Sequence, residues 1–567
     1  MTTLVFGCRI FPPSHRSTSV FSRAGALLIL FPLLAAFATV ISGCGSRETA
    51  VERGIREQVL HRGIGPDLAD LDPHFATGTS DHSVLSALFE GLIAEDPVDL
   101  RPVPGVAERW QVSMDGLTYT FFLRADARWS NGKSVTAQDF LASWQRALSP
   151  TLQADNANLM YAVQGAEAYH KNKLSDFSQV GFAAPDARTV RITLERPTPY
   201  FLNLLQHWIW WPVPIETIQA QGPLYTRGSS WARPGQIVGN GPFVLKEWRS
   251  GQRIVVEKSP TYWDAATVRL NAIHFHTIDD VNAEERAFRS GQLHLTDALP
   301  VSKVDSYRRD PTGVLRIDPY LNTYFYRLNV TRPFLNLPAV RRALSLAIDR
   351  EALVSRILRG GQLPATVFTP PGVDGYVPPK GVATDPDAAR ALLAQAGYPG
   401  GQGAPSIDLL YNTSENHRQI AEAVQEMWRR ELGLQVRLTN MENKSVLEAR
   451  RVGSYQILRS NWIGDYNDAM SFLGIWRSDS GNNYTGWTSS AYDNLLNEAA
   501  RTSDPQARSV LLRRAEELLL QETPLIPIYH YTHVFLLHPS VKGWHSTLLD
   551  HHPYKHVWLE ASPRATP

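Results

Sequence analysis

Cysteine is nearly missing from this sequence of 567 residues, which contains only Cys8 and Cys44. A zinc or iron–sulfur site built on several thiolates is therefore excluded. A chain of this length with so few thiols also has to rely on the burial of apolar side chains for its stability.

An excess of charge of either sign is missing too. The 56 lysines and arginines nearly equal the 55 aspartates and glutamates. Such a balance argues against a nucleic acid or an anionic membrane surface as the main partner. The length exceeds what one apolar core supports, so two or three domains are expected. The 15 tryptophans and 20 tyrosines are many, and they could stiffen an interface or line a pocket.

Catalytic signatures with a fixed spacing are absent. The sequence has no G-x-S-x-G and no H-E-x-x-H motif. The run Gly132-Lys133-Ser134 resembles the end of a phosphate-binding loop, but Ala127 stands where such a loop requires glycine. We therefore expect a binding protein that is not an enzyme and needs no cofactor. An exported hydrolase is the alternative from another class, and the missing nucleophile and base argue against it.

The 17 histidines raise the question of a metal site. His274 and His276 would share one face of a strand, because side chains two residues apart point the same way. His530 and His533 also lie close in the sequence. No carboxylate–histidine spacing converges on a site, so we expect surface or half-buried imidazoles and no bound metal.

One long apolar run occurs, over residues 24–41, and three arginines precede it. A positive flank, an apolar centre and small residues predict an export signal over residues 1–43. Residues 41–44 (ISGC) resemble the lipobox of bacterial lipoproteins, and this resemblance implies that Cys44 carries the lipid. A single membrane-spanning anchor is the alternative, which Pro32 weakens. Whether the lipid would insert into the inner or the outer membrane stays open.

Hydrophobic periodicity predicts an α/β fold that follows a polar tether over residues 47–64. The predicted elements are strands at 117–123, 189–194, 254–257, 407–411 and 434–438, and helices at 337–358, 385–397 and 416–432. The last strand–helix–strand run implies a parallel strand pair joined by a crossover helix.

Several sequence blocks resemble, in order, the bacterial oligopeptide-binding proteins of ABC importers (family 5 extracellular solute-binding proteins). The blocks are residues 71–74 (LDPH), 88–92 (LFEGL), 104–110 (PGVAERW), 129–140 (WSNGKSVTAQDF), 143–146 (SWQR), 240–246 (NGPFVLK), 259–263 (SPTYW), 411–414 (YNTS) and 462–468 (WIGDYND). Together they span nearly all of the chain after the predicted signal. The resemblance implies a two-lobed α/β periplasmic-binding-protein fold of class II type with an extra small inserted domain.

The resemblance also implies domain boundaries. Lobe I would comprise residues 45–89, 215–321 and 533–567, so it would be discontinuous in the sequence. The inserted domain would comprise residues 90–214, and lobe II residues 322–532.

The implied function is that of a monomeric, lipid-anchored periplasmic protein that captures oligopeptides between its lobes. It would deliver them to the transmembrane subunits of an ABC permease. The peptide backbone would pair like an added strand, and hydrated pockets would accept varied side chains. A binder of murein peptides, or of a metal or haem chelate on the same fold, is the alternative.

The implied site centres on Asp465, which matches the acid that pairs with the peptide α-ammonium in this family. From the residues alone, an Asx turn within the D-Y-N-D loop is the simpler interpretation. Trp462 would pack on a ligand side chain, and Tyr161 and Tyr531 would contribute hydroxyl or backbone contacts. A place in the apolar core is the alternative for each of these aromatic residues.

Three cations stand where the family places groups that meet the peptide carboxylate, namely Arg459, Arg450 and His417. Arg459 closely precedes Trp462 in the sequence. Arg450 and His417 could equally be solvated helix residues.

The chain also departs from the family pattern. A family lysine corresponds to Leu358, a tryptophan to Asn443 and a glutamate to Thr77. The two positions of a family disulfide correspond to Asn322 and Ile463. These departures leave the preferred peptide length and the side-chain pockets open, while the implied amine anchor is unchanged.

Overall fold

The computed structural model describes residues 48–226, 228 and 230–561, so the predicted signal and Cys44 lie outside the described residues. The elements below all belong to one compact unit that begins at Ala50. Among the described residues, no helix combines the length and the apolar character that crossing a bilayer requires.

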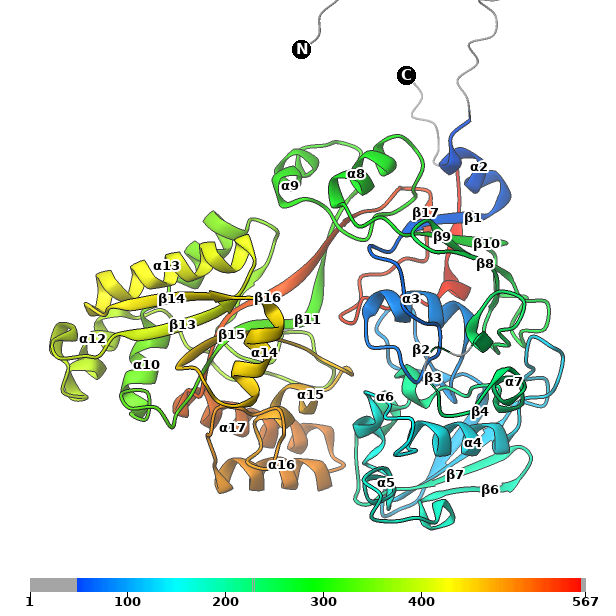
Figure 1. The fold of residues 1–567 in the computed structure, drawn as a ribbon, viewed down its shortest axis with the longest axis horizontal. Coiled ribbons are helices and arrows are strands. Elements are labelled where there is room, and N and C mark those ends of the chain that lie inside the picture. The colour runs from blue at the N-terminus through cyan, green and yellow to red at the C-terminus, as the bar shows by residue number, and fades with distance from the viewer. Residues whose placement is uncertain (1–47, 227, 229, 562–567) are drawn as a thin grey trace, which may run out of the picture. The chain divides into compact units, whose positions relative to one another are not determined.

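The largest sheet has six strands and lies in the second half of the chain (Figure 1). Its strand order is β12-β16-β11-β15-β13-β14, and β13 pairs with β14 in parallel, which confirms the predicted parallel pair. Along β11, Tyr324 and Tyr326 face one apolar core and Phe325 faces another, as strand alternation requires. The strands are β11 (Leu315–Leu328), β12 (Leu363–Pro364), β13 (Ile407–Asn412), β14 (Val436–Met441), β15 (Ile457–Ile463) and β16 (Leu525–Leu536).

Helices cover both faces of this sheet. The core that contains Tyr324 and Tyr326 is completed by α10, α12 and α13, and the core that contains Phe325 by α15, α16 and α17. The helices of this half are α10 (Pro338–Leu346), α11 (Arg350–Ala352), α12 (Pro386–Gln395), α13 (Glu415–Leu432), α14 (Asn443–Arg451), α15 (Met470–Leu473), α16 (Ser490–Arg501) and α17 (Pro505–Glu522).

Two four-stranded sheets, with the orders β1-β10-β9-β8 and β4-β5-β7-β6, lie in the first half of the chain. One continuous apolar core contains residues of both sheets, among them Leu60, Phe121 and Phe275. The strands are β1 (Val59–Gly63), β4 (Ala107–Val112), β5 (Thr118–Leu123), β6 (Phe182–Asp186), β7 (Thr189–Thr193), β8 (Phe243–Arg249), β9 (Arg253–Lys258) and β10 (Ala272–His276), with the short pair β2 (Ile93–Glu95), β3 (Pro102–Pro104). A second short pair, β17 (Val541–Lys542) and β18 (Trp558–Leu559), comes from the C-terminal end of the chain. The helices are α2 (Ala50–Glu57), α3 (Thr79–Leu88), α4 (Ala137–Ala147), α5 (Ala166–His170), α6 (Phe201–Leu204), α7 (Ile215–Gln221), α8 (Val281–Arg289) and α9 (Val301–Arg308).

Sequence blocks that are far apart in the chain meet through buried polar contacts. Arg146 forms an ion pair of 2.6 Å with Asp72, and their side chains are 0% and 2% exposed. The Glu90 carboxylate accepts the indole N–H of Trp263 at 2.6 Å, and Asn240 exchanges two hydrogen bonds with the Glu90 backbone. Because a buried charge is costly unless it is paired, these blocks hold the first half of the molecule together.

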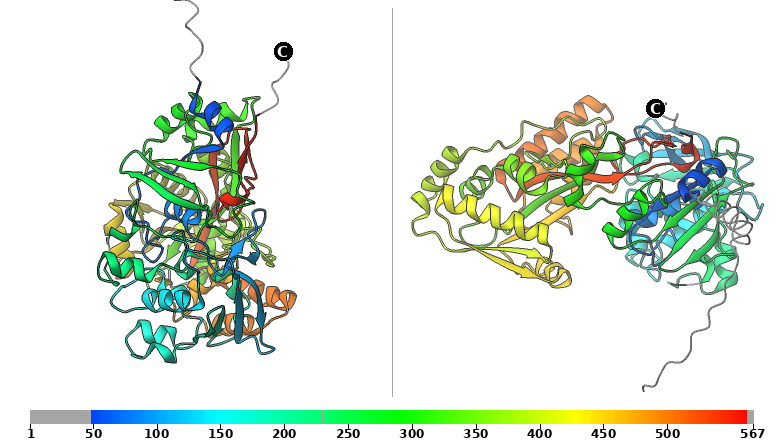
Figure 2. Two further views of the ribbon diagram at one scale, coloured as in Figure 1. Left: turned by 90° about the vertical axis from the view of Figure 1, so that its right-hand side faces the viewer. Right: turned by 90° about the horizontal axis from the view of Figure 1, so that it is seen from above.

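Strands β11 and β16 connect two cores. Their first paired stretch, which includes Ile317 and Val534, packs in a small cluster with Leu299 and Val304, whereas Tyr326 and Ile526 pack in the core with α13. The views of Figure 2 show the two strands side by side. The lobe boundaries predicted at 321/322 and 532/533 fall inside these two strands.

The predicted tether over residues 47–64 is wrong from residue 50 onward, because α2 and β1 occupy it. The segment is rich in charge, but its few apolar residues are buried: Val51 is 5% exposed and Leu60 is 0% exposed. Gly54 lets α2 approach closely, since a Cβ there would lie 2.4 Å from the carbonyl oxygen of Val59.

The single helix predicted over residues 337–358 is also wrong in part. Helix α10 ends at Leu346, and a new turn begins after Asp349, whose carboxylate accepts the backbone N–H of Ala352. A cap of this kind competes with continuation of the helix. Arg350 is buried and donates to the carbonyl oxygens of Ser345 and Pro527, which fixes the break.

Candidate ligand-binding site

A cavity of about 550 Å³ lies between residues 156–204 and residues 462–500. Three of the predicted site residues, Tyr161, Trp462 and Asp465, line it. Its volume is in the usual range for a site that takes a small ligand. The structure therefore brings the predicted amine anchor together with two of the predicted aromatic contacts.

The Asp465 carboxylate faces this cavity without a partner. Among the described residues, no side chain and no backbone N–H is hydrogen-bonded to it, although its own backbone N–H donates to Ser471 Oγ at 2.8 Å. The Asp465 side chain is exposed to the cavity, and partial desolvation by the surrounding protein raises its pKa to about 6. A carboxylate in this state gains free energy from any cation that can reach it.

Short-range contacts hold Asp465 in place. The indole N–H of Trp462 donates to the carbonyl oxygen of Ser471 at 2.7 Å, so Ser471 connects both predicted site residues. Gly464 lies so close to Leu321 and Phe472 that a Cβ would come within 2.5 and 2.8 Å of their side chains. The glycine is therefore required for the close approach of this loop to the core.

The second acid of the same loop is fully paired. Asp468 receives both Nη atoms of Arg508, at 2.7 and 2.8 Å, and it accepts the backbone N–H of Met470. Arg508 also lies over the ring of Tyr200, which stacks on Tyr466 with a centroid distance of 5.1 Å. Asp468 is therefore paired, and Asp465 is the acid of this loop whose carboxylate has no partner among the described residues.

Two further cations, Arg196 and Arg477, line the same cavity and were missed by sequence reasoning. Arg477 is engaged by Asn497 at 2.8 Å and by Asp479 at 3.0 Å. Arg196 is exposed. Neither residue belongs to a motif, and only the fold places residue 196 opposite residue 477, so no pattern in the sequence could have identified them.

Arg459, His417 and Tyr531 form a separate cluster around Tyr324. Arg459 donates to the Tyr531 hydroxyl at 3.1 Å and lies 4.7 Å from the centroid of the Tyr324 ring, which is 5.6 Å from the His417 ring. Burial, and then the charge of Arg459, lower the pKa of His417 to about 4. His417 Nδ1 and Arg459 Nε are buried without a hydrogen-bond partner among the described residues. The free N–H of the Arg459 guanidinium is a donor that a ligand carboxylate would satisfy.

The sequence proximity of Arg459 and Trp462 does not place them together. Both lie on β15, but Arg459 contacts Tyr324 of one core, whereas Trp462 packs against the core on the other face of the sheet. Arg450 stands apart on α14, where it lies over the ring of Tyr484 at 4.8 Å. Arg459, His417, Tyr531 and Arg450 do not line the cavity that contains Asp465.

The structure also shows where the positions that depart from the family pattern lie. Asn322 and Ile463, the two positions that the resemblance matches to a family disulfide, are direct partners in the β11–β15 pair. Leu358 is 6% exposed and belongs to the core with α13. Thr77 and Asn443 are exposed.

Comparison with known proteins identifies the family. The model of the bacterial extracellular solute-binding proteins of family 5 (middle region) matches residues 101–484. The periplasmic oligopeptide-binding protein OppA of Escherichia coli K12 is 35% identical, over 86% of this chain and 90% of the relative.

Solved structures share the fold. The unliganded open form of the murein tripeptide-binding protein MppA superimposes with a TM-score of 0.77 at 33% identity, over 89% of this chain and 97% of that chain. Haemophilus influenzae OppA in complex with RPPGFSPFR gives a TM-score of 0.73 at 30% identity, over 89% and 99% of the two chains. The two-lobed α/β fold predicted from the sequence is thereby confirmed. The chain belongs to the bacterial extracellular solute-binding proteins of family 5.

Proposed function

We propose that this chain is an extracytoplasmic receptor that binds short peptides by their free N-terminus and delivers them to an ABC permease. The observation that carries the proposal is the unpaired Asp465 carboxylate in a cavity of about 550 Å³. The relatives that are named as oligopeptide-binding proteins support the same ligand class.

The α-ammonium of a peptide would pair with Asp465 and supply the cation that the protein itself does not provide. Trp462 and Tyr161 would contact the first residues of the peptide from the two sides of the cavity. The peptide backbone would be paired as an added strand, which does not depend on sequence. Because the fixed charge binds only the α-ammonium and backbone pairing does not depend on sequence, the site would accept peptides of many different sequences.

The peptide carboxylate has two candidate binding places. Arg459 and His417, with the Tyr531 hydroxyl beside them, offer orphaned donors outside the cavity. Arg196 and Arg477 offer cations inside the cavity that contains Asp465. We propose the first pair for longer peptides and the second for short ones. Arg450 would serve as a further, more distant cation.

Binding would be coupled to transport by closure of the lobes about β11 and β16. A ligand shifts a hinge equilibrium only by its difference in affinity for the two states. Contacts made from both sides of the cavity, by Tyr161 on one side and Asp465 on the other, supply such a difference. The closed form is what the transmembrane subunits would recognise.

The proposed setting is the periplasm, with a monomeric chain held to the membrane by lipid on Cys44. Mass spectrometry of the N-terminus should show that residues 1–43 are removed and that acyl chains are attached. A mature N-terminus that still carries residues 1–43, or a Cys44 without acyl chains, would contradict the lipid anchor.

Native mass spectrometry of the protein purified from a bacterial host tests the ligand class. We expect co-purified peptides of mixed mass. A single murein peptide would identify a murein-peptide receptor, as the similarity to MppA allows. A single metal or haem chelate, or cleavage of added peptides, would contradict the proposal.

A further inference from the structure

Three histidines lie on one face of the parallel β1–β10 pair. His61 of β1 is the direct partner of His274 of β10, and Gly63 is the partner of His276. Because side chains two residues apart on a strand point to the same face, His274 and His276 both face the side of His61. The adjacency of β1 and β10 joins residues that are more than 200 positions apart in the sequence.

The ring nitrogens of the three side chains are close enough to share one ion. One ligand nitrogen from each residue lies within 4.8 Å of the others, and His61 Nδ1 is 3.1 Å from His276 Nε2. Two nitrogens bound tetrahedrally to zinc at 2.0–2.1 Å are separated by about 3.3 Å. His61 Nδ1 and His276 Nε2, which are hydrogen-bonded to each other in the metal-free chain, are therefore close to the spacing of a metal site, and the ligand nitrogen of His274 lies within 4.8 Å of both.

The cluster holds polar atoms that the protein leaves unused. His274 Nδ1 is buried and has no hydrogen-bond partner among the described residues. The backbone N–H of His61 donates to Nδ1 of His294 at 3.0 Å, which fixes the strand next to the cluster.

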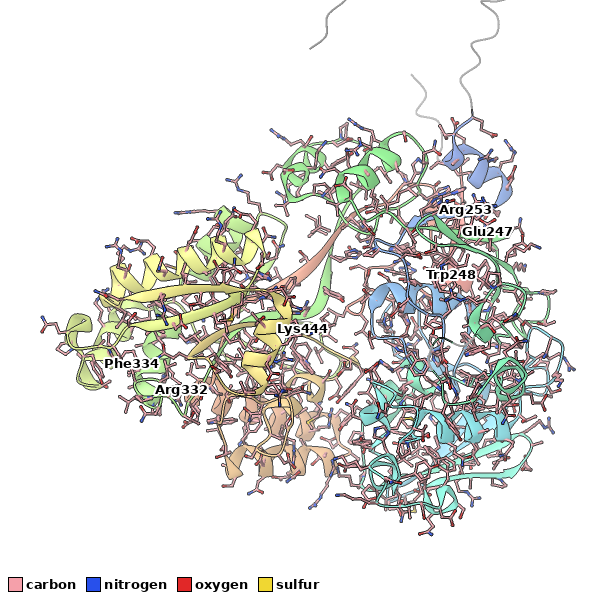
Figure 3. All side chains as sticks on the ribbon, viewed as in Figure 1. Glu247, Trp248, Arg253, Arg332, Phe334 and Lys444 are labelled. Carbon is pink, nitrogen blue, oxygen red and sulfur yellow. The ribbon has the colours of Figure 1, made fainter. Side chains whose placement is uncertain are left out.

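A histidine binds a metal ion through its neutral imidazole ring. The nearby charges are of both signs. Arg253 is bound by Glu247 at 2.8 Å, and Figure 3 shows this pair on the β8–β9 hairpin.

We propose that His61, His274 and His276 bind one divalent transition-metal ion of the zinc class, with the remaining coordination position left to water. Imidazole nitrogen is a preferred ligand for zinc, copper and nickel. His274 and His276 are half-buried, which leaves an entry path for the ion. None of the three residues lines the cavity that contains Asp465, so this site is distinct from the peptide site. A bound ion would join β1, which lies near the N-terminal end of the described chain, to β10.

The test uses the full chain, purified without a histidine tag and stripped with a chelator. After incubation with zinc chloride and gel filtration, we expect one zinc per chain and a higher melting temperature. X-ray absorption at the zinc edge should show imidazole nitrogens at about 2.0 Å. Failure to retain zinc, or a spectrum without imidazole scattering, would overturn the proposal.

His276→Gln and, independently, His274→Gln should abolish stoichiometric retention and the rise in melting temperature. His545→Gln, at an exposed histidine outside the cluster, is the matched control and should behave like the unmodified chain. The melting temperature of each metal-free variant checks its fold. Equal zinc retention by the His276 and His545 variants would contradict the assignment.

Discussion

Two aspartates three positions apart, Asp465 and Asp468, have opposite environments in this molecule. Asp468 is bound by both Nη atoms of Arg508, and their side chains are 7% and 12% exposed. Asp465 faces a cavity, has no donor on its carboxylate among the described residues, and has a pKa raised to about 6. A paired acid stabilises the fold, whereas an unpaired acid costs stability and is useful only when a ligand supplies the cation. Whether an aspartate is paired with a cation of the protein therefore distinguishes an acid that stabilises the fold from one that is available to a ligand.

The largest effect is expected at the structural acid. Asp468→Asn leaves the guanidinium of Arg508 nearly buried without its counter-charge, which typically costs about 3–5 kcal/mol of unfolding free energy. Chemical denaturation measures this loss. An unchanged midpoint of unfolding would show that Asp468 does not stabilise the fold, so it would not differ from Asp465 in this respect.

Asp465→Asn should show the opposite behaviour. The substitution removes a charge that the protein does not compensate, so the unfolding free energy of the unliganded chain should not fall. Peptide affinity should fall by about 2–5 kcal/mol, since one member of an enclosed charge pair is lost. Isothermal titration calorimetry measures the affinity, with either a synthetic tripeptide or a peptide isolated from the co-purified mixture. Unchanged affinity would remove Asp465 from the site.

The groups proposed to bind the peptide carboxylate can be tested in the same way. Amidation of the peptide C-terminus should weaken binding by about 1.5–3 kcal/mol, the usual range for hydrogen bonds to a charged group. Arg459→Met should abolish the difference for longer peptides, and Arg477→Met for short ones. Equal binding of amidated and free peptides to the unmodified chain would count against both proposed carboxylate sites.

The pH dependence of binding should have the smallest effect. With a pKa of about 6 in the free protein and a lower value beside a bound ammonium, affinity should fall roughly tenfold, or about 1.4 kcal/mol, between pH 7 and pH 5. Asp465→Asn should flatten this dependence. The unfolding free energy changes with pH in the opposite direction from the affinity. Because the pKa of Asp465 in the folded chain lies above the usual 3.8, the folded chain gains stability as the pH falls through 6 and loses this gain as the pH rises. A pH-independent affinity would contradict the raised pKa.

Much of the fold could be predicted from local patterns. Helix α12 begins at Pro386 after the capping Asp385, and the parallel β13–β14 pair follows from the strand–helix–strand order. Hydrophobic periodicity did not predict the elements of segments in which only a few apolar residues are buried. The charged segment over 50–63 forms α2 and β1, because Val51 and Leu60 find buried places that only the tertiary structure provides.

The site was predictable only as far as motifs extend. The WIGDYND run identified Asp465, but it could not show that Arg508, 40 positions later, pairs with Asp468 and leaves Asp465 free. His274 and His276 were predicted to share a strand face, whereas their contact with His61 depends on the neighbour of β10 in the sheet. Contacts between distant segments are the information that spacing along one strand or helix does not contain.

The most direct measurement compares a free tripeptide with its N-acetylated form on the unmodified chain and on Asp465→Asn. Acetylation should weaken binding to the unmodified chain by at least about tenfold and have little effect on the variant, because both changes remove the same charge pair. Equal affinity of the unmodified chain for the acetylated and the free peptide would show that Asp465 does not bind the peptide α-ammonium.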